Sequence, residues 1–165
     1  MKFLMIAAAA LMGTPALAQN SNFVGPRVEA TVGVNDVSGR VAANKFDIDR
    51  GDLVYGAVAG VDVPLGNDFV VGVEGDATNV FNKDRSFGAN ARLGYSINNV
   101  ALVYGKVGYE NYKDAFSRKL DGFRYGGGVE LKAGRSLFLK AEYRRTNFEN
   151  RATSDAGLVG FGFRL

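Results

Sequence analysis

Alternation between apolar and polar residues is the feature that most constrains this chain, and residues 122–148 show it most clearly. Within them, residues 124–132 and 137–144 alternate strictly and are separated by a short turn that contains a glycine. Successive side chains of a β-strand point to opposite faces, so these two segments predict a hairpin. One face of the hairpin is apolar, and the other carries charges of both signs, such as Glu130 and Lys140.

The same alternation recurs along the chain and predicts eight strands. Each is near the length of about 9–11 residues that a tilted strand needs to cross a bilayer. The predicted strands are residues 26–34, 53–63, 69–77, 87–97, 100–110, 124–132, 137–144 and 157–165. Long polar connections at 35–52, 79–86, 111–121 and 147–155 alternate with short turns at 64–68, 98–99 and 133–136. This arrangement predicts an all-β fold, an eight-stranded antiparallel up-and-down transmembrane β-barrel.

Alternation alone does not decide which face lies outside, because a soluble barrel places its apolar face inside. An apolar exterior is favoured because the polar face mixes glycines with opposite charges, which could pair within a narrow lumen. Aromatic residues near the strand ends also resemble interfacial girdles. The predicted lumen charges are Glu74, Asp76, Arg92, Lys106, Glu110, Glu130, Lys140, Glu142 and Arg144. The predicted lipid-facing girdle is Tyr55, Phe69, Tyr95, Tyr109, Tyr125, Tyr143, Phe161 and Phe163.

Residues 1–18 have the pattern of a secretory signal peptide, with Lys2 before an apolar stretch and an Ala-Leu-Ala cleavage site at 16–18. The barrel domain is therefore expected to comprise residues 19–165. The sequence contains no histidine and no cysteine, which excludes histidine-based and thiol-based catalysis, disulfides and histidine zinc sites. We expect no catalytic residue, no cofactor and no metal. The formal net charge of +3 comes without a basic block and does not indicate nucleic-acid binding.

Several short motifs resemble the opacity/porin-like family of outer-membrane barrels, which is related to the OmpA transmembrane domain. They are Gly-Val-Glu-Gly-Asp at 72–76, Ala-Arg-Leu-Gly-Tyr at 91–95, Tyr-Gly-Gly-Gly-Val-Glu at 125–130, Leu-Lys-Ala-Glu-Tyr at 139–143 and Phe-Gly-Phe-Arg-Leu at 161–165. The resemblance implies that Glu74, Arg92, Glu130 and Lys140 are the central lumen charges, with lysine at 140 where the better-known relative has arginine. It also implies a C-terminal assembly signal at Phe161, Phe163 and Leu165, with leucine in place of the usual phenylalanine.

These observations predict a monomeric outer-membrane protein of a Gram-negative bacterium with a structural or surface-exposed role and no enzyme activity. The expected partners are outer-membrane lipid, lipopolysaccharide, the barrel assembly machinery and host surface molecules, with both termini in the periplasm. Two alternatives stay open, a small ion-conducting pore and a soluble periplasmic ligand-binding barrel. Residues 50–52 spell Arg-Gly-Asp at the end of the longest predicted loop, where the interpretation as an ordinary strand start is preferred to adhesion.

Overall fold

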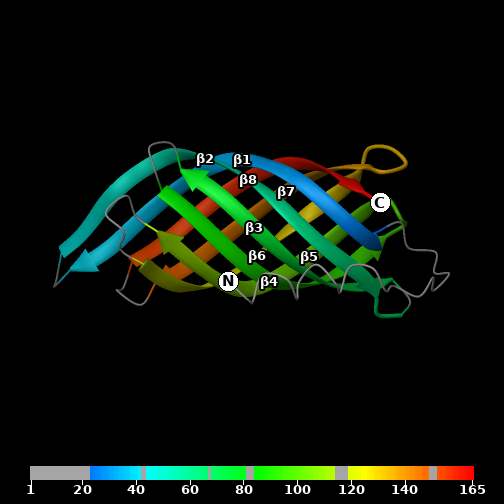
Figure 1. Cartoon of the computed structure of the whole chain (residues 1–165), viewed down its shortest axis with the longest axis horizontal. Helices are drawn as coiled ribbons and strands as arrows, with labels where there is room; N and C mark the ends of the chain where they lie inside the picture. The colour runs from blue at the N-terminus through cyan, green and yellow to red at the C-terminus, as the bar shows by residue number, and fades with distance from the viewer. Residues whose placement is uncertain (1–22, 42–43, 67, 81–83, 114–118, 149–151) are drawn as a thin grey trace, which may run out of the picture.

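The chain forms a closed barrel of eight antiparallel strands, seen in a computed structural model that describes residues 23–41, 44–66, 68–80, 84–113, 119–148 and 152–165 (Figure 1). Each strand pairs with its neighbours in the sequence, and β1 pairs with β8 to close the sheet. The strands are β1 (Gly25–Val41), β2 (Asn44–Pro64), β3 (Phe69–Val80), β4 (Asp84–Ile97), β5 (Ala101–Lys113), β6 (Lys119–Lys132), β7 (Leu137–Phe148) and β8 (Ala152–Arg164). The predicted fold class is confirmed. Among the described residues, no helix is long and apolar enough to span a membrane.

The strands are staggered, and the stagger sets the shape of the interior. A path through successive register partners from Arg27, across all eight strands, returns to β1 at Val37, ten residues further along. A barrel with this shear has strongly tilted strands. Many of the ion pairs described below join strands that are not adjacent in the sheet, such as Arg92 on β4 with Asp62 on β2.

One end of the barrel carries the short connections and is called here the turn end. The turn between β4 and β5 places Asn98 and Asn99 at φ values of 51° and 56°, with Val100 N donating to Ile97 O at 3.0 Å. Two consecutive positive φ angles define a type I′ hairpin turn, which asparagine tolerates and which matches strand twist. The predicted turns at 64–68, 98–99 and 133–136 therefore join strands at one end, as expected.

The opposite end, called the long-strand end, differs from the expectation. Residues 35–52 were expected to form a loop, but β1 and β2 continue through them until Val41 pairs with Asn44. These two strands project beyond the others at the left of Figure 1. The other three predicted long loops are likewise shortened by strand residues at both of their ends. The extensions carry only short alternations, with Val37 and Val41 on β1 and Phe46 and Ile48 on β2. Register shifts after Asn35 and after Val37 separate these short segments from the longer alternation, so the pattern did not predict them as strand.

The Arg-Gly-Asp tripeptide lies within β2 and does not close a loop. Arg50 pairs with Asp36 and Asp52 pairs with Asn35, with a register shift between Asn35 and Asp36. Two residues of one strand thus span three of the other, which is the geometry of a β-bulge. The predicted signal peptide, residues 1–18, lies outside the described residues.

The apolar face of every strand points outward and the charged face points inward. Val73 has 59% of its surface exposed, whereas Glu130 has none. All eight predicted girdle residues are exposed on the outer wall. This is the inverse of a soluble barrel, so the alternative of a soluble ligand-binding barrel is excluded.

Inward-facing glycines make room for the long polar side chains. A Cβ atom on Gly72 would collide with the Asp62 carboxylate, and one on Gly128 would lie 2.7 Å from the Tyr104 hydroxyl. Gly162 similarly leaves space for the Phe138 ring. The excess of glycine noted in the sequence is thus a packing requirement of a narrow lumen filled with large residues.

Candidate functional site

Buried charged side chains fill the interior of the barrel. Among the described residues they comprise seven acids and seven bases, so the interior is formally neutral. We call this set the lumen network. Its members are Arg27, Glu29, Asp62, Glu74, Asp76, Arg92, Lys106, Glu110, Arg124, Glu130, Lys140, Glu142, Arg144 and Arg164. A buried charge is tolerated only when it is paired and hydrogen-bonded, so the geometry of each pair matters.

The part of the network nearest the turn end is organised around Asp62 on β2. Its carboxylate accepts hydrogen bonds from Arg27 Nε at 2.9 Å and from Arg164 Nη1 at 2.6 Å. Arg92 binds the same carboxylate through two nitrogens, at 2.8 and 2.6 Å. Arg92 and Arg164 also both bind Glu130, the latter at 2.8 Å. Two carboxylates therefore hold three guanidinium groups together.

The middle of the network alternates lysines with carboxylates. Glu74 accepts from Arg27 at 2.5 Å and from Lys106 at 2.8 Å. Lys106 also contacts Glu142 at 2.7 Å, and the Tyr104 hydroxyl donates to Glu142 at 2.7 Å. These side chains come from four different strands, so the contacts cross the lumen and tie its walls together.

The part nearest the long-strand end is built around Arg124 on β6. Arg124 binds Asp76 at 2.8 Å and Glu110 at 2.5 Å, and Thr146 donates to Glu110 at 2.7 Å. Arg144 connects this part to the middle, since it lies 3.4 Å from Asp76 and 3.2 Å from Glu142. The lumen network is thus continuous along the barrel.

The four charges that the resemblance implied as central are all buried but do not form one quartet. Glu130 and Lys140 are register partners on β6 and β7, yet they make no ion pair with each other. Lys140 Nζ binds Glu29 and lies 3.3 Å from Glu142 instead. A lysine is a compact point charge and cannot form the two-pronged contact of arginine, so a position between two carboxylates suits it.

The structure buries all nine predicted lumen charges and adds five that were not singled out. These are Arg27, Glu29, Asp62, Arg124 and Arg164. Each lies on the polar parity of its strand, so the alternation could have identified it. The ion pairs could not be predicted in the same way, because they depend on the register between strands, as where Gly60 lies between Arg27 and Glu74.

Apolar side chains close the lumen at the turn end. Phe23 precedes β1 and is buried with Val70, Leu102 and Tyr104. Arg164 Nη1 donates to Phe23 O at 2.7 Å, and its guanidinium carbon lies 5.8 Å from the centre of the Phe23 ring. Phe23 gave no sequence signal because it stands before the first alternating segment. We call Phe23, Val70, Leu102 and Tyr104 the basal plug.

A second apolar cluster lies inside the barrel near the long-strand end. Val54 on β2 and Leu158 on β8 pack together with Ala156. Gly33 on β1 is the register partner of both Val54 and Leu158, and its missing side chain lets them meet. Apolar packing thus supplements the ion pairs across the β8–β1–β2 wall.

The outer wall carries aromatic residues toward both ends. Phe69 and Tyr95 stack edge to face at 5.1 Å near the turn end, and Phe161 and Phe163 lie on β8 toward the same end. Tyr55, Tyr109, Tyr125 and Tyr143 lie further along their strands, toward the long-strand end. The terminal Leu165 is 84% exposed, and its backbone N–H donates to Pro26 O at 2.9 Å. Among the described residues, no cluster of acidic, histidine or cysteine side chains has the arrangement of a metal site.

Comparison with known proteins supports this architecture. The family model for the outer membrane protein beta-barrel domain matches residues 4–164. The structure is similar to that of neisserial surface protein A, with a TM-score of 0.59, 15% identity and coverage of 85% of this chain and 97% of that one. No curated protein matches the chain significantly.

Two further solved structures have comparable similarity. The N-terminal β-barrel domain of Pseudomonas aeruginosa OprF has a TM-score of 0.54 at 15% identity and covers 89% of this chain and 100% of that one. Ail, the attachment invasion locus protein of Yersinia pestis, was solved with the heparin analogue sucrose octasulfate. It has a TM-score of 0.54 at 14% identity and covers 85% of this chain and 99% of that one. At these identities the similarity concerns the fold alone.

Proposed function

Because this chain belongs to the outer membrane protein β-barrel domain family, we propose that it is a non-catalytic envelope protein that acts through its exposed end rather than through its lumen. Family membership implies the outer membrane of a Gram-negative bacterium. In this proposal the long-strand end faces outside and meets lipopolysaccharide and host surface molecules. The barrel itself anchors that end in the membrane.

The observation that carries this proposal is the packed, neutral lumen. Its described charges balance, they bind one another from β1 to β8, and the basal plug covers them at the turn end. An interior of this kind is suited to holding the barrel together. A role for the protein is therefore best sought at the surface that projects beyond the membrane.

The strand extensions of β1 and β2 give that surface a rigid base. Backbone pairing continues from Asn35 and Asp52 to the last pair, Val41 with Asn44. Binding residues on connecting segments are commonly positioned by a rigid scaffold of this kind. Ail illustrates that a barrel of similar fold can be crystallised with a sulfated sugar, which makes sulfated glycans the first host molecules to test.

The remaining elements of the proposal concern export and assembly. Residues 1–18 act as a signal peptide, and residues 19–165 form the mature, monomeric barrel with both termini in the periplasm. Phe161, Phe163 and Leu165 contact the barrel assembly machinery during insertion. Their outward position at the end of the last strand supports this role.

The test is to shorten the exposed end without disturbing the barrel. Residues 36–51 are replaced by Asn-Gly, a dipeptide that favours a two-residue hairpin turn between the register partners Asn35 and Asp52. Binding of intact bacteria to a heparin surface is compared between this variant and the full-length chain at equal surface amounts. Loss of binding in a variant that still shows heat-dependent migration on gels is expected. Unchanged binding would contradict an adhesive role for this end.

A small ion-conducting pore is the second candidate. The continuity of the lumen network favours it, because the polar groups extend from Arg164 near the turn end to Glu110 near the other. The basal plug argues against it in the resting state. Reproducible conductance steps from the purified protein would favour this second function.

A further inference from the structure

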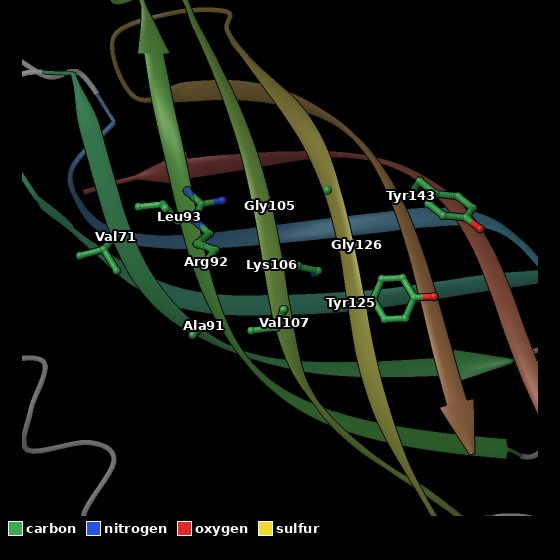
Figure 2. Close-up of a pocket in the computed structure, with 11 residues that line it drawn as sticks. Val71, Ala91, Arg92, Leu93, Gly105, Lys106, Val107, Tyr125, Gly126 and Tyr143 are labelled. Atoms are coloured by element: carbon green, nitrogen blue, oxygen red, sulfur yellow. The ribbon is translucent and has the colours of Figure 1, made fainter. Parts of the chain in front are cut away.

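The outer wall carries a shallow trough of about 810 Å³ that crosses β3 to β7 (Figure 2). Gly105 and Gly127 form part of its floor, and Figure 2 places Val71 and Leu93 on one side with Tyr125 on the other. We call it the wall trough. Its volume falls within the range of about 300–1,000 Å³ that ligand sites occupy.

The trough arises from one row of outward-facing residues. Leu93 pairs with Gly105, Gly105 pairs with Gly127, and Gly127 pairs with Tyr143. Across four neighbouring strands the row thus has a large side chain, two positions without a side chain, and a second large side chain. Two glycines side by side leave bare backbone at the surface between two bulky side chains.

These two glycines have no role in the lumen packing that explains the inward-facing ones. Both point outward, and neither has a positive φ that would require glycine. A Cβ atom on Gly105 would meet only the Gly126 carbonyl oxygen, at 3.9 Å, whereas one on Gly127 would lie 2.9 Å from the Tyr104 carbonyl oxygen, so only Gly105 leaves space that a side chain could fill. Glycine weakens a strand interior and commonly marks a place where a ligand or another backbone approaches closely. The space over Gly105 in the wall trough is therefore open to an occupant.

The chemistry of the lining selects an apolar, elongated occupant. Arg92 and Lys106 border the trough, but their side chains are buried in the lumen network. The side chains that face it belong to apolar residues and to the rings of Tyr125 and Tyr143. Wall atoms beside an unfilled trough would lose their dispersion contacts, and a hydrocarbon chain restores them without burying a polar group.

A cationic group lies just beyond the trough on its long-strand side. Arg145 is the register partner of Tyr125 and follows Tyr143 by two residues on β7. Its side chain is 42% exposed, and Asp155, with Nε to Oδ1 at 3.5 Å, is its sole ion-pair partner among the described residues. The Tyr143 hydroxyl also donates to Asp155, which fixes that ring as a wall of the trough. The other guanidinium nitrogens of Arg145 can bind a phosphate.

We propose that the wall trough binds one acyl chain of a lipopolysaccharide molecule whose lipid A phosphate contacts Arg145. This proposal rests on the orientation given in the proposed function, because only then does Arg145 lie in the outer, lipopolysaccharide-containing leaflet. The apolar lining lies toward the turn end and the Arg145 guanidinium toward the long-strand end. This order matches that of the acyl chain and the phosphate in lipid A. The trough would make this lipid a bound partner rather than part of a uniform lipid surface.

The test is native mass spectrometry of the full chain, refolded in detergent with bis-phosphorylated lipid A. Gly105→Leu fills the trough, and Gly75→Leu is the matched control. Gly75 also faces outward, and its Cβ would meet only the Gly88 carbonyl oxygen at 3.8 Å. The natural chain and Gly75→Leu are expected to retain one lipid A molecule. Gly105→Leu is expected to lower that retention by about tenfold or more.

Arg145→Gln separates the phosphate contact from the acyl contact. It is expected to lower retention of bis-phosphorylated lipid A by about tenfold while leaving retention of dephosphorylated lipid A unchanged. Equal retention by Gly105→Leu and Gly75→Leu would overturn the proposal. So would a dimer of the natural chain that Gly105→Leu abolishes, because the trough would then bind a second copy. Specific lipid A retention by a barrel that fails the heparin assay would support this inference while contradicting the adhesive role.

Discussion

Arg92 on β4 binds Asp62 on β2 through two nitrogens, at 2.8 and 2.6 Å, across the strand that separates them. The contact reaches over β3 because Gly72, the register partner of both residues, has no side chain to fill the space between them. Two-pronged arginine–carboxylate pairs are among the strongest and most directional hydrogen-bonded contacts in proteins. This pair shows how the lumen network ties one part of the wall to another.

Removal of the Asp62 carboxylate is expected to destabilise the barrel strongly. Asp62→Ala leaves Arg27, Arg92 and Arg164 without a shared partner, and uncompensated buried charges cost about 3–5 kcal/mol. Urea titration of the refolded protein, followed by circular dichroism, measures the loss. Asp155→Ala is the control, since an exposed ion pair contributes only about 0–1 kcal/mol. Equal midpoints for the two variants would contradict the assignment of Asp62 as the centre of its cluster.

Glu130 gives an independent test of the same network from β6. Its side chain is completely buried, and it binds Arg92 and Arg164. Glu130→Ala should lower stability by about 3–5 kcal/mol, because two guanidinium groups lose a carboxylate. The temperature at which the folded band disappears from gels reports the change. An unchanged transition temperature would show that Glu130 does not hold the barrel together.

Two glycines on β3 test which side of the wall is packed. Gly72→Val places atoms where the Asp62 carboxylate lies, and overpacking of this kind costs about 1–3 kcal/mol or prevents folding. Gly75→Val adds the same atoms to the outer face, where a Cβ meets nothing closer than 3.8 Å. Refolding yield and urea midpoint are expected to fall for the first variant only. A lower yield and midpoint in both variants would indicate that glycine is needed there for the backbone and not for side-chain packing.

Phe23 is expected to stabilise the barrel from outside its strands. Phe23→Ala opens a cavity beside Val70 and Leu102 and removes the ring next to Arg164, at a cost of about 3–5 kcal/mol. Phe23→Leu keeps most of the volume and should cost less than half as much. Urea titration distinguishes them. Equal stability of Phe23→Ala and the natural chain would contradict a stabilising role for the basal plug.

The fold could be predicted from the sequence because the evidence for each strand and turn lies within that segment. Strict alternation with period two sets which face of each strand is inside, and Asn98 and Asn99 encode a hairpin turn by themselves. The burial of Glu29 or Asp62 follows from the same parity. The ion-pair partners of these residues do not follow from parity, because they depend on the register of the closed sheet, which no single strand specifies.

Several features could not be predicted from the alternation, for physical reasons. Val54 is apolar on the inward parity, where it packs against Leu158 across Gly33. The extensions of β1 and β2 alternate over only a few residues, such as Phe46 and Ile48, and register shifts after Asn35 and Val37 interrupt their pairing. The wall trough escaped as well, since Gly105 and Gly127 become neighbours only through the register of β5 and β6.

We propose that the lumen network holds the barrel together and that the lumen does not conduct ions. Planar-bilayer recording of the purified, refolded natural chain tests it most directly, with Phe23→Ala as the variant that opens the turn end. The natural chain is expected to give no conductance steps above those of a protein-free bilayer, and Phe23→Ala to give measurable ones. Reproducible steps from the natural chain, at the level of the variant, would contradict the claim and favour the pore.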